Sequence, residues 1–141
     1  MDFTKFDIEK AASNGVEVPI IFWQTGEPLS DEDGTPIVFT VCGQDSSRWV
    51  NVRREEHKKL AKRNKQLDLS DPDQVNAMNQ RILSQCVLSF TGNISWDGKA
   101  LECEPESLYD FFSQPGNTWV VEQINVATNN RKNLKVIGAD V

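Results

Sequence analysis

The residues that could act as catalysts are few, and their surroundings do not favour catalysis. The only histidine, His57, lies among lysine and arginine residues, where a general base would be exposed and would have no partner to orient it. No serine lies in the Gly-x-Ser-x-Gly pattern of a nucleophile elbow, and no glycine-rich loop follows a predicted strand to hold a phosphate. The sequence therefore predicts a protein that is not an enzyme.

Two sets of residues are of the types that bind metals, but their spacing argues against a metal site. Three glutamates lie in the turn that leads into a predicted helix: Glu102, Glu104 and Glu106. They could form an acid/base or metal cluster. We favour the alternative that their negative charge complements the dipole at the N-terminus of the helix. The cysteines are scattered, without a Cys-x-x-Cys pair or zinc spacing; they are Cys42, Cys86 and Cys103. Three such cysteines are typical of buried thiols in a reducing compartment. We expect no metal and no cofactor.

The length and composition favour one folded domain. The chain has 141 residues, of which 38% are hydrophobic and 26% charged, and it includes four tryptophans and seven phenylalanines that can fill a core. No segment approaches the roughly 18 apolar residues that a membrane span needs. The first seven residues also lack the basic start and apolar run of a secretory signal. We therefore expect a single domain over residues 1–141, located in the cytoplasm and without membrane contact.

The formal net charge of −6 is unevenly distributed along the chain. Between Arg48 and Lys65 there are eight basic residues and only two acidic ones, Glu55 and Glu56, so this segment has a local net charge of +6. The remaining residues together carry −12. A basic element on an acidic body calls for a functional explanation.

The basic segment is predicted to form a helix over residues 45–66, because residues 44–47 offer good N-cap side chains. Trp49 and Val52 near its start can dock on a core, but the rest is almost entirely polar. Such a helix either projects into solvent or lies along a partner. We expect its partner-binding residues to be Trp49, Val52, Arg53, Arg54, Lys58, Lys59, Lys62, Arg63 and Lys65.

Three interpretations of the basic helix remain open. It can be a solvated face on which Glu55 and Glu56 form pairs with residues three or four positions away. It can bind an acidic protein, or it can bind nucleic acid. A nucleic-acid-binding helix usually belongs to a basic domain, whereas the acidic remainder of this chain would repel a polyanion. Protein is therefore the favoured partner, and nucleic acid is disfavoured.

The N-terminal part predicts a β-ribbon over residues 16–43, after a short helix over residues 2–12. Residues 16–23 are rich in β-branched and aromatic types, and Pro19 makes this an edge strand or a strand entry because proline has no N–H to donate. Residues 25–35 predict an acidic, turn-rich loop, and residues 36–42 predict the returning strand. Since a two-stranded ribbon is marginal in water, it must lie on helices or gain strands.

The C-terminal part, residues 71–130, predicts a helical core. Asp71 followed by a proline begins a helix whose apolar stripe, Val75, Met78, Ile82, Cys86 and Phe90, extends to about residue 92. A small hairpin near residues 94–101 turns on Asp-Gly, and its arms are candidates for pairing with the ribbon. A short helix begins at residue 105 and ends before Pro115-Gly116, with Leu108, Phe111 and Phe112 facing inward. A last helix is capped by Thr118. Residues 131–141 are predicted to form a loose tail. The expected fold is α+β, an N-terminal β-hairpin packed on a C-terminal group of three to four helices.

The order of these pieces resembles the tail assembly chaperones of long-tailed bacteriophages. Residues 39–46, Phe-Thr-Val-Cys-Gly-Gln-Asp-Ser, match a hydrophobic–Gly–x–Asp–Ser segment that precedes a basic helix in that family. Residues 94–99, Ile-Ser-Trp-Asp-Gly-Lys, match its tryptophan and turn, Pro105-Glu106 match its Pro-Glu pair, and Trp119 with Gln123 match its closing motif. The likeness covers residues 16–126, although Glu104 stands where the family has a threonine.

The resemblance implies a protein that binds other proteins. Members of this family are thought to coat the tape-measure protein and to bring tail-tube subunits to it, with self-association as a further possibility. They act in the host cytoplasm and are absent from the mature virion, and many relatives also occur as a longer frameshifted product. Two alternatives from other classes stay open: a structural virion protein, such as a tail-completion or head–tail adaptor, and a small nucleic-acid-binding regulatory protein that uses the basic helix.

Overall fold

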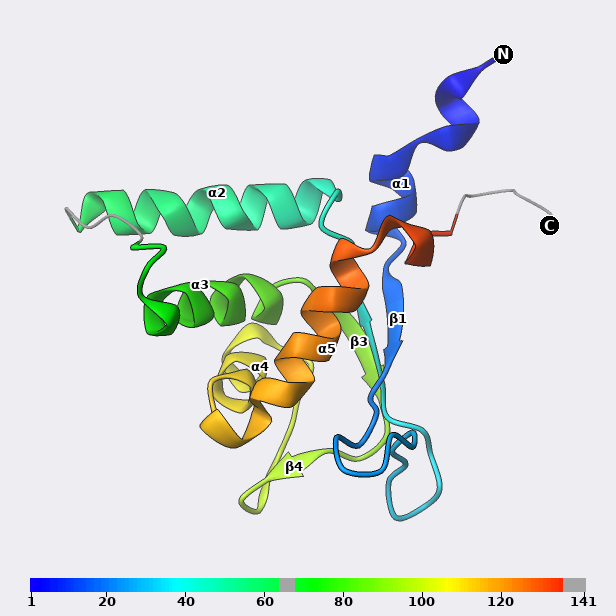
Figure 1. Cartoon of the computed structure of the whole chain (residues 1–141), viewed down its shortest axis with the longest axis vertical. Helices are drawn as coiled ribbons and strands as arrows, with labels where there is room; N and C mark the ends of the chain where they lie inside the picture. The colour runs from blue at the N-terminus through cyan, green and yellow to red at the C-terminus, as the bar shows by residue number, and fades with distance from the viewer. Residues whose placement is uncertain (64–67, 136–141) are drawn as a thin grey trace.

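A three-stranded antiparallel sheet forms the centre of the computed structural model, which describes residues 1–63 and 68–135. Its strands are β1 (Val16–Pro19), β2 (Val38–Val41) and β3 (Val87–Thr91), in the order β1-β2-β3. The register pairs Val18 with Phe39 and Phe39 with Phe90, so the three strands share one apolar face. Together with the helices this confirms the predicted α+β class (Figure 1).

The third strand corrects the prediction of one helix from residue 71 to about residue 92. Helix α3 (Pro72–Ser84) ends at the C-cap Gln85, and the chain continues as β3 along the open side of β2. Cys86 and Phe90 fit the spacing of the helical stripe, but the segment 87–91 is also rich in β-branched and aromatic residues. The unpaired backbone of β2 supplies the hydrogen bonds that favour the strand. The ribbon thus gains a strand.

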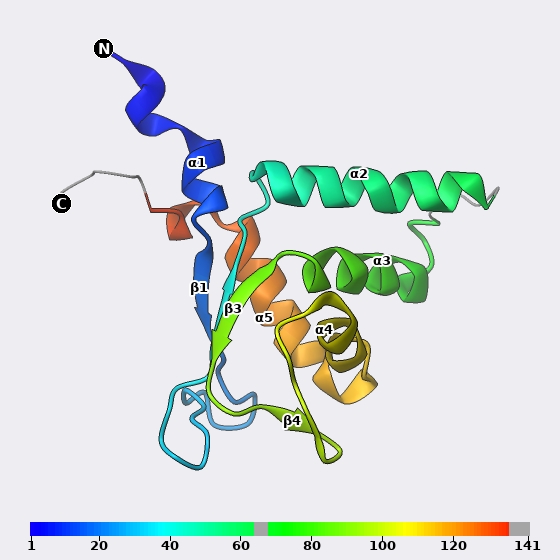
Figure 2. The ribbon, with the colours of Figure 1, turned by 180° about the vertical axis from the view of Figure 1, so that it is seen from behind.

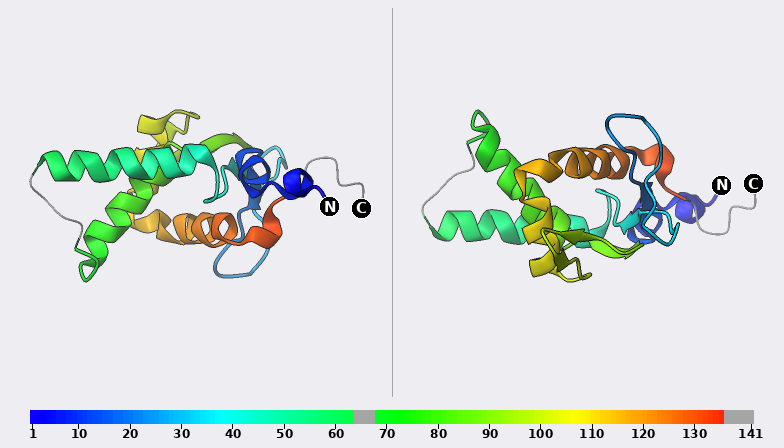
Figure 3. Two further views of the ribbon diagram at one scale, coloured as in Figure 1. Left: turned by 90° about the horizontal axis from the view of Figure 1, so that it is seen from above. Right: turned by 90° about the horizontal axis from the view of Figure 1, so that it is seen from below.

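Helices α2 (Ser47–Lys62), α3, α4 (Pro105–Phe112) and α5 (Thr118–Asn129) surround the sheet's apolar face and one end of the molecule. Helix α5 lies across β1 and β2, α4 packs on α3 and α5, and α3 crosses beneath α2 when the molecule is seen from above (Figures 1 and 3). Their inward residues join the sheet in one hydrophobic core. As predicted, α4 contributes Leu108, Phe111 and Phe112.

Local signals set most helix starts. Asp71 caps α3 by accepting the backbone N–H of Asp73 at 3.0 Å, as its position before Pro72 predicts. The prediction for α5 was one residue off, because Thr118 is the first helical residue and Asn117 is the N-cap. The predicted N-terminal helix corresponds to two pieces, a 3₁₀ turn η1 (Phe3–Phe6) and α1 (Ile8–Ser13).

The outer edge of β1 is closed to a further strand. Pro19 offers no backbone N–H there, as expected for an edge strand. Two residues later, the backbone N–H of Ile21 donates to Gln123 Oε1 and Gln123 Nε2 donates to the carbonyl of Ile21, both at 2.8 Å. The amide of Gln123 thus takes the place of a neighbouring strand, and it fastens α5 to the ribbon.

The small hairpin forms where it was predicted, from β4 (Ser95–Trp96) and β5 (Lys99–Ala100). Asp97 and Gly98 both have positive φ, 50° and 81°, which is the geometry of a type I′ turn. The hairpin is a separate two-stranded sheet, so the expected pairing with the ribbon was wrong (Figure 2). Trp96 instead lies over Gly116, where an added Cβ would be 3.0 Å from its ring.

The start of the C-terminal tail is held in place, contrary to the prediction of a loose segment from residue 131. Residues 131–133 form a 3₁₀ turn, η3 (Arg131–Asn133). Arg131 donates two hydrogen bonds to the carboxylate of Asp45, at 2.8 and 3.1 Å, and Leu134 packs against the core. The rest of the predicted tail, residues 136–141, lies outside the described residues.

Candidate partner-binding surface

Helix α2 presents the basic residues, and its position is fixed at its start. The side chain of Ser46 caps the helix by accepting the backbone N–H of Trp49 at 3.1 Å. Just before it, Gly43 packs so closely on Ala12 and Leu134 that an added Cβ would lie within 3.0 Å of both side chains. Arg48 then donates to the backbone carbonyl of Gln85 at 2.8 Å, which ties the first turn to the end of α3.

One face of α2 belongs to the core, which corrects two of the predicted partner-binding residues. Trp49 is only 6% exposed and is part of the hydrophobic core, so it cannot contact a partner. Val52 is half-buried and packs against the same core, as does Leu60 two turns further along. The helix therefore packs across α3 instead of projecting freely into solvent (Figure 3).

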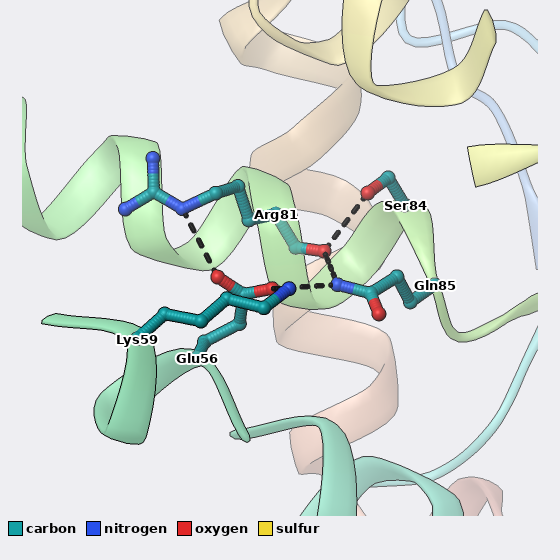
Figure 4. A network of polar contacts seen from close by, with 5 residues as sticks. All are labelled: Glu56, Lys59, Arg81, Ser84 and Gln85. Carbon is teal, nitrogen blue, oxygen red and sulfur yellow. Dashed lines mark hydrogen bonds and ion pairs between the residues drawn. The ribbon is translucent and has the colours of Figure 1, made fainter. Parts of the chain in front are cut away.

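The buried carboxylate of Glu56 joins α2 to α3 and was not foreseen as a site residue. Glu56 is 5% exposed, and it accepts hydrogen bonds from Gln85 Nε2 at 3.0 Å and from Lys59 Nζ at 3.2 Å. Arg81 Nε lies 3.4 Å from its other oxygen (Figure 4). The sequence did hold a signal for this role, since Glu56 is four residues from Val52 and four from Leu60, on the face that packs inward.

The remaining predicted residues lie on the exposed part of α2 and its C-cap. They are Arg53, Arg54, Lys58, Lys59, Lys62 and Arg63, while Lys65 lies outside the described residues. Lys58 pairs with Glu55 at 3.5 Å and Lys59 with Glu56 at 3.2 Å, so both of these ion pairs stay within the helix. Over residues 1–63 and 68–135, none of these basic side chains forms an ion pair with a carboxylate on another element. The positive charge is therefore not neutralised by the acidic body.

A shallow hollow of about 480 Å³ runs along this exposed face. Its lining residues recur at three- and four-residue steps and are Val50, Arg53, Arg54, His57, Lys58 and Ala61. Small apolar side chains thus lie on a stripe flanked by cations. This arrangement suits a partner helix with a narrow apolar seam and acidic neighbours. His57 faces solvent on this stripe and contacts no group that would orient it for catalysis within the described part of the chain.

Two carboxylates of the body, Asp31 and Asp45, have partners in a loop and in the tail, whereas Glu9 accepts from the backbone N–H and the hydroxyl of Ser47 in the first turn of α2. Hydrogen bonds from the backbone N–H groups of Asn93 and Thr35 lower the pKa of Asp31. The hydrogen bond from Arg131 likewise lowers the pKa of Asp45. Asp31 and Asp45 thus hold a loop and the tail in place, and none of their bonds reaches α2.

The residues considered as metal ligands do not converge. Over the described residues, no group of three histidine, cysteine or carboxylate side chains could hold a metal ion. Glu102, Glu104 and Glu106 are exposed. Cys42 and Cys86 are buried, and burial raises the pKa of the Cys86 thiol to about 12, whereas Cys103 is exposed.

A second surface, a groove between β1 and α5, was missed by sequence reasoning. It has a volume of about 710 Å³, and its apolar walls are Pro19, Trp23, Trp119 and Val126. Trp23 was assigned to the predicted strand 16–23, but the strand ends at Pro19 and Trp23 is 66% exposed. Only the tertiary structure brings Trp23 beside α5.

Comparisons of the chain with protein-family models, with curated proteins and with solved structures found no match. Each helix within residues 1–63 and 68–135 is too short or too polar to cross a bilayer.

Proposed function

We propose that this protein is a tail assembly chaperone of a long-tailed bacteriophage, which binds the tape-measure protein and helps to recruit tail-tube subunits. It carries out no chemistry, acts in the host cytoplasm and is absent from the finished particle. The observation that carries the proposal is the exposed face of α2, whose cations form no ion pair with the rest of the described chain. The order of the sequence motifs supplies the link to this family.

The motif residues have roles that suit a binding protein. Ser46 caps α2, Asp97 and Gly98 make the hairpin turn, and Gln123 closes the edge of β1. None of these residues forms part of a catalytic group. Ser46 acts on α2 itself, whereas the turn and Gln123 shape the hairpin and hold α5 to the ribbon, which supports the interpretation that the family pattern preserves a scaffold.

The proposed mechanism is reversible, charge-guided contact with a helical client. Acidic residues of the client pair with Arg53, Arg54 and Lys58, while a narrow apolar seam lies against Val50 and Ala61. Because these groups are exposed, each pair contributes little, and the attraction is screened by salt. A long client with repeated acidic helical segments can then be coated by many copies and later released.

Co-expression with the tape-measure protein, followed by affinity capture, tests this proposal. Replacing Arg53, Arg54 and Lys58 by glutamate should weaken capture about tenfold or more, because attraction becomes repulsion. The matched control replaces Lys10, Lys99 and Lys132 by glutamate, which makes the same change in net charge on exposed residues outside α2. Equal capture by the α2 variant and the wild-type protein would contradict the proposal.

The nucleic-acid alternative is favoured by the same exposed cations, and it has a separate test. Filter binding with a DNA duplex and with single-stranded RNA should show no steep dependence of affinity on salt if protein is the client. A steep dependence that disappears in the α2 variant would favour nucleic acid instead. Detection of the protein in purified particles in stoichiometric amount would favour the structural virion protein.

A further inference from the structure

The N-terminal arm, defined here as residues 2–7, exposes apolar side chains without covering any core. Phe3 is 73% exposed and Phe6 is 53% exposed, and their rings contact edge to face with centroids 5.9 Å apart. None of the residues of η1 is buried. Figure 1 shows this turn beyond α1 at the N-terminal end of the molecule, away from the helices that surround the core. The two phenylalanines form a convex aromatic knob.

The β1–α5 groove is the concave counterpart of this knob. Pro19, Trp23, Trp119 and Val126 line it, and Val126 is 71% exposed on the outer face of α5. An exposed tryptophan beside an exposed valine in a hollow leaves apolar surface in water, which is unfavourable unless another apolar group covers it. Phe3 and Phe6 of the arm and Trp23 and Val126 of the groove are each more than half exposed.

The groove accepts side chains and does not accept an added strand. The backbone of Ile21 is already bonded to Gln123 on this edge, and Pro19 has no N–H to offer. An occupant therefore binds by inserting apolar side chains between β1 and α5. Two phenylalanines on a single turn supply such an insert, and aromatic pairs add favourable contacts with Trp23 and Trp119.

Charged residues of both signs are present on the two surfaces, so opposite charges can pair across the contact. Glu17 and Glu122 border the groove and are exposed, with Lys135 as a further neighbour. On the arm, the carboxylates of Asp2 and Asp7 are bonded to backbone N–H groups of Thr4 and Lys10. Lys5 is the cation of the arm, with its Nζ 5.3 Å from the centroid of the Phe6 ring, and it is the group that can pair with Glu17 or Glu122.

We propose that the N-terminal arm of one copy docks in the β1–α5 groove of a second copy. Phe3 and Phe6 enter between Trp23 and Val126, and Lys5 approaches Glu17 or Glu122. Because the two surfaces differ, the contact is head-to-tail, and a pair joined by one contact still has one free arm and one free groove. The contact therefore builds open chains, and it does not depend on the client proposed for α2.

Sedimentation velocity of the full chain, from about 10 µM to 1 mM, tests this arrangement in the range of weak association. The average mass of the wild-type protein should rise with concentration beyond that of a dimer. The variant with Phe3→Ser and Phe6→Ser and the variant with Trp23→Ser should each associate at least about tenfold more weakly, since each loses one half of the contact. All three residues are more than half exposed, so both variants should fold normally.

Mixing the two variants is the decisive measurement. One variant keeps an intact groove and the other keeps an intact arm, so the mixture should form a 1:1 dimer that grows no further. Leu69→Ser, which removes a 79% exposed apolar side chain elsewhere, should associate like the wild-type protein. A wild-type protein that stays monomeric, a single variant that still assembles, or a mixture that stays monomeric while the wild-type protein assembles would each overturn the proposal.

Discussion

Glu56 is the residue whose removal best tests how α2 is held. Replacement by alanine deletes a carboxylate that is 5% exposed, accepts hydrogen bonds from Gln85 and Lys59, and forms an ion pair with Arg81. We expect Glu56→Ala to lower the free energy of unfolding by about 1–3 kcal/mol. The physical reason is weaker attachment of α2, because the contacts with Gln85 and Arg81 connect the polar half of α2 to α3 and its C-cap.

The three contacts of Glu56 contribute unequally to the free energy of unfolding. Lys59 is 61% exposed and three residues away, so its pair contributes about 0.3–0.5 kcal/mol. The bond from Gln85 and the pair with Arg81, whose side chain is 36% exposed, are shielded better, and each contributes about 1 kcal/mol. The free-energy cost of burying the Glu56 carboxylate offsets part of this sum. When Glu56 is removed, the Arg81 side chain can be solvated by water. The loss of stability therefore stays below that seen when one partner of a fully buried ion pair is removed.

Urea titration monitored by circular dichroism measures this loss, with an unchanged slope as the sign that the same surface unfolds. The matched control is Glu55→Ala, since Glu55 is 63% exposed and pairs only with Lys58 in the described structure. It should change the free energy of unfolding by less than about 0.5 kcal/mol. A double-mutant cycle with Arg81→Ala should give a coupling energy of about 1 kcal/mol. If Glu56→Ala costs no more than the control, the reasoning about this network is wrong.

Three further outcomes follow from burial and bonding. Trp49→Ala should lower the free energy of unfolding by about 3–5 kcal/mol in the same titration, because Trp49 is 6% exposed and packs in the core. A loss under about 1 kcal/mol would show that the Trp49 side chain is not buried. Gln123→Ala should cost about 1–3 kcal/mol and speed amide hydrogen exchange at Ile21, and unchanged exchange measured by NMR would contradict the edge closure. In the native protein at about pH 8, iodoacetamide should label Cys103 before Cys86, because burial raises the pKa of the Cys86 thiol to about 12; mass spectrometry of the labelled peptides decides the order.

The sequence predicted those parts of the fold that depend on local chemistry. The cap at Asp71, the turn at Asp97 and Gly98, and the edge position of the strand with Pro19 are each specified by residues close in the chain, and all were confirmed. The strand β3 was missed because its identity depends on a distant element. Residues 86–90 fit a helix equally well by spacing, and only the open side of β2 favours the strand.

The candidate surface divides in the same way. The charge of α2 and the exposure of Arg53, Arg54 and Lys58 could be predicted, because a helix with so few apolar residues cannot bury its basic side chains in a core. The spacing along α2 indicates which face of the helix is turned inward, but the partners of Glu56, which are Gln85 and Arg81, depend on how α3 lies under α2, and periodicity on one helix does not show this. The groove at Trp23 requires β1 and α5 to meet, and they are about a hundred residues apart in the chain.

The separation of charge in the folded protein also bears on which partner α2 can accept. Asp31, Asp68 and Asp71 accept backbone N–H groups and Asp45 is occupied by Arg131, so these four acids lie in loops and caps, whereas eight of the fifteen lysine and arginine residues lie between Arg48 and Lys65. A polyanion that extends beyond α2 meets this acidic body, whereas an acidic helix can confine its charge to one stripe. At physiological salt the Debye length is about 8 Å, so direct contacts along α2 persist while repulsion from more distant carboxylates is screened. Binding of an acidic helix should therefore depend less steeply on salt than binding of a nucleic acid, whose affinity depends on released counterions.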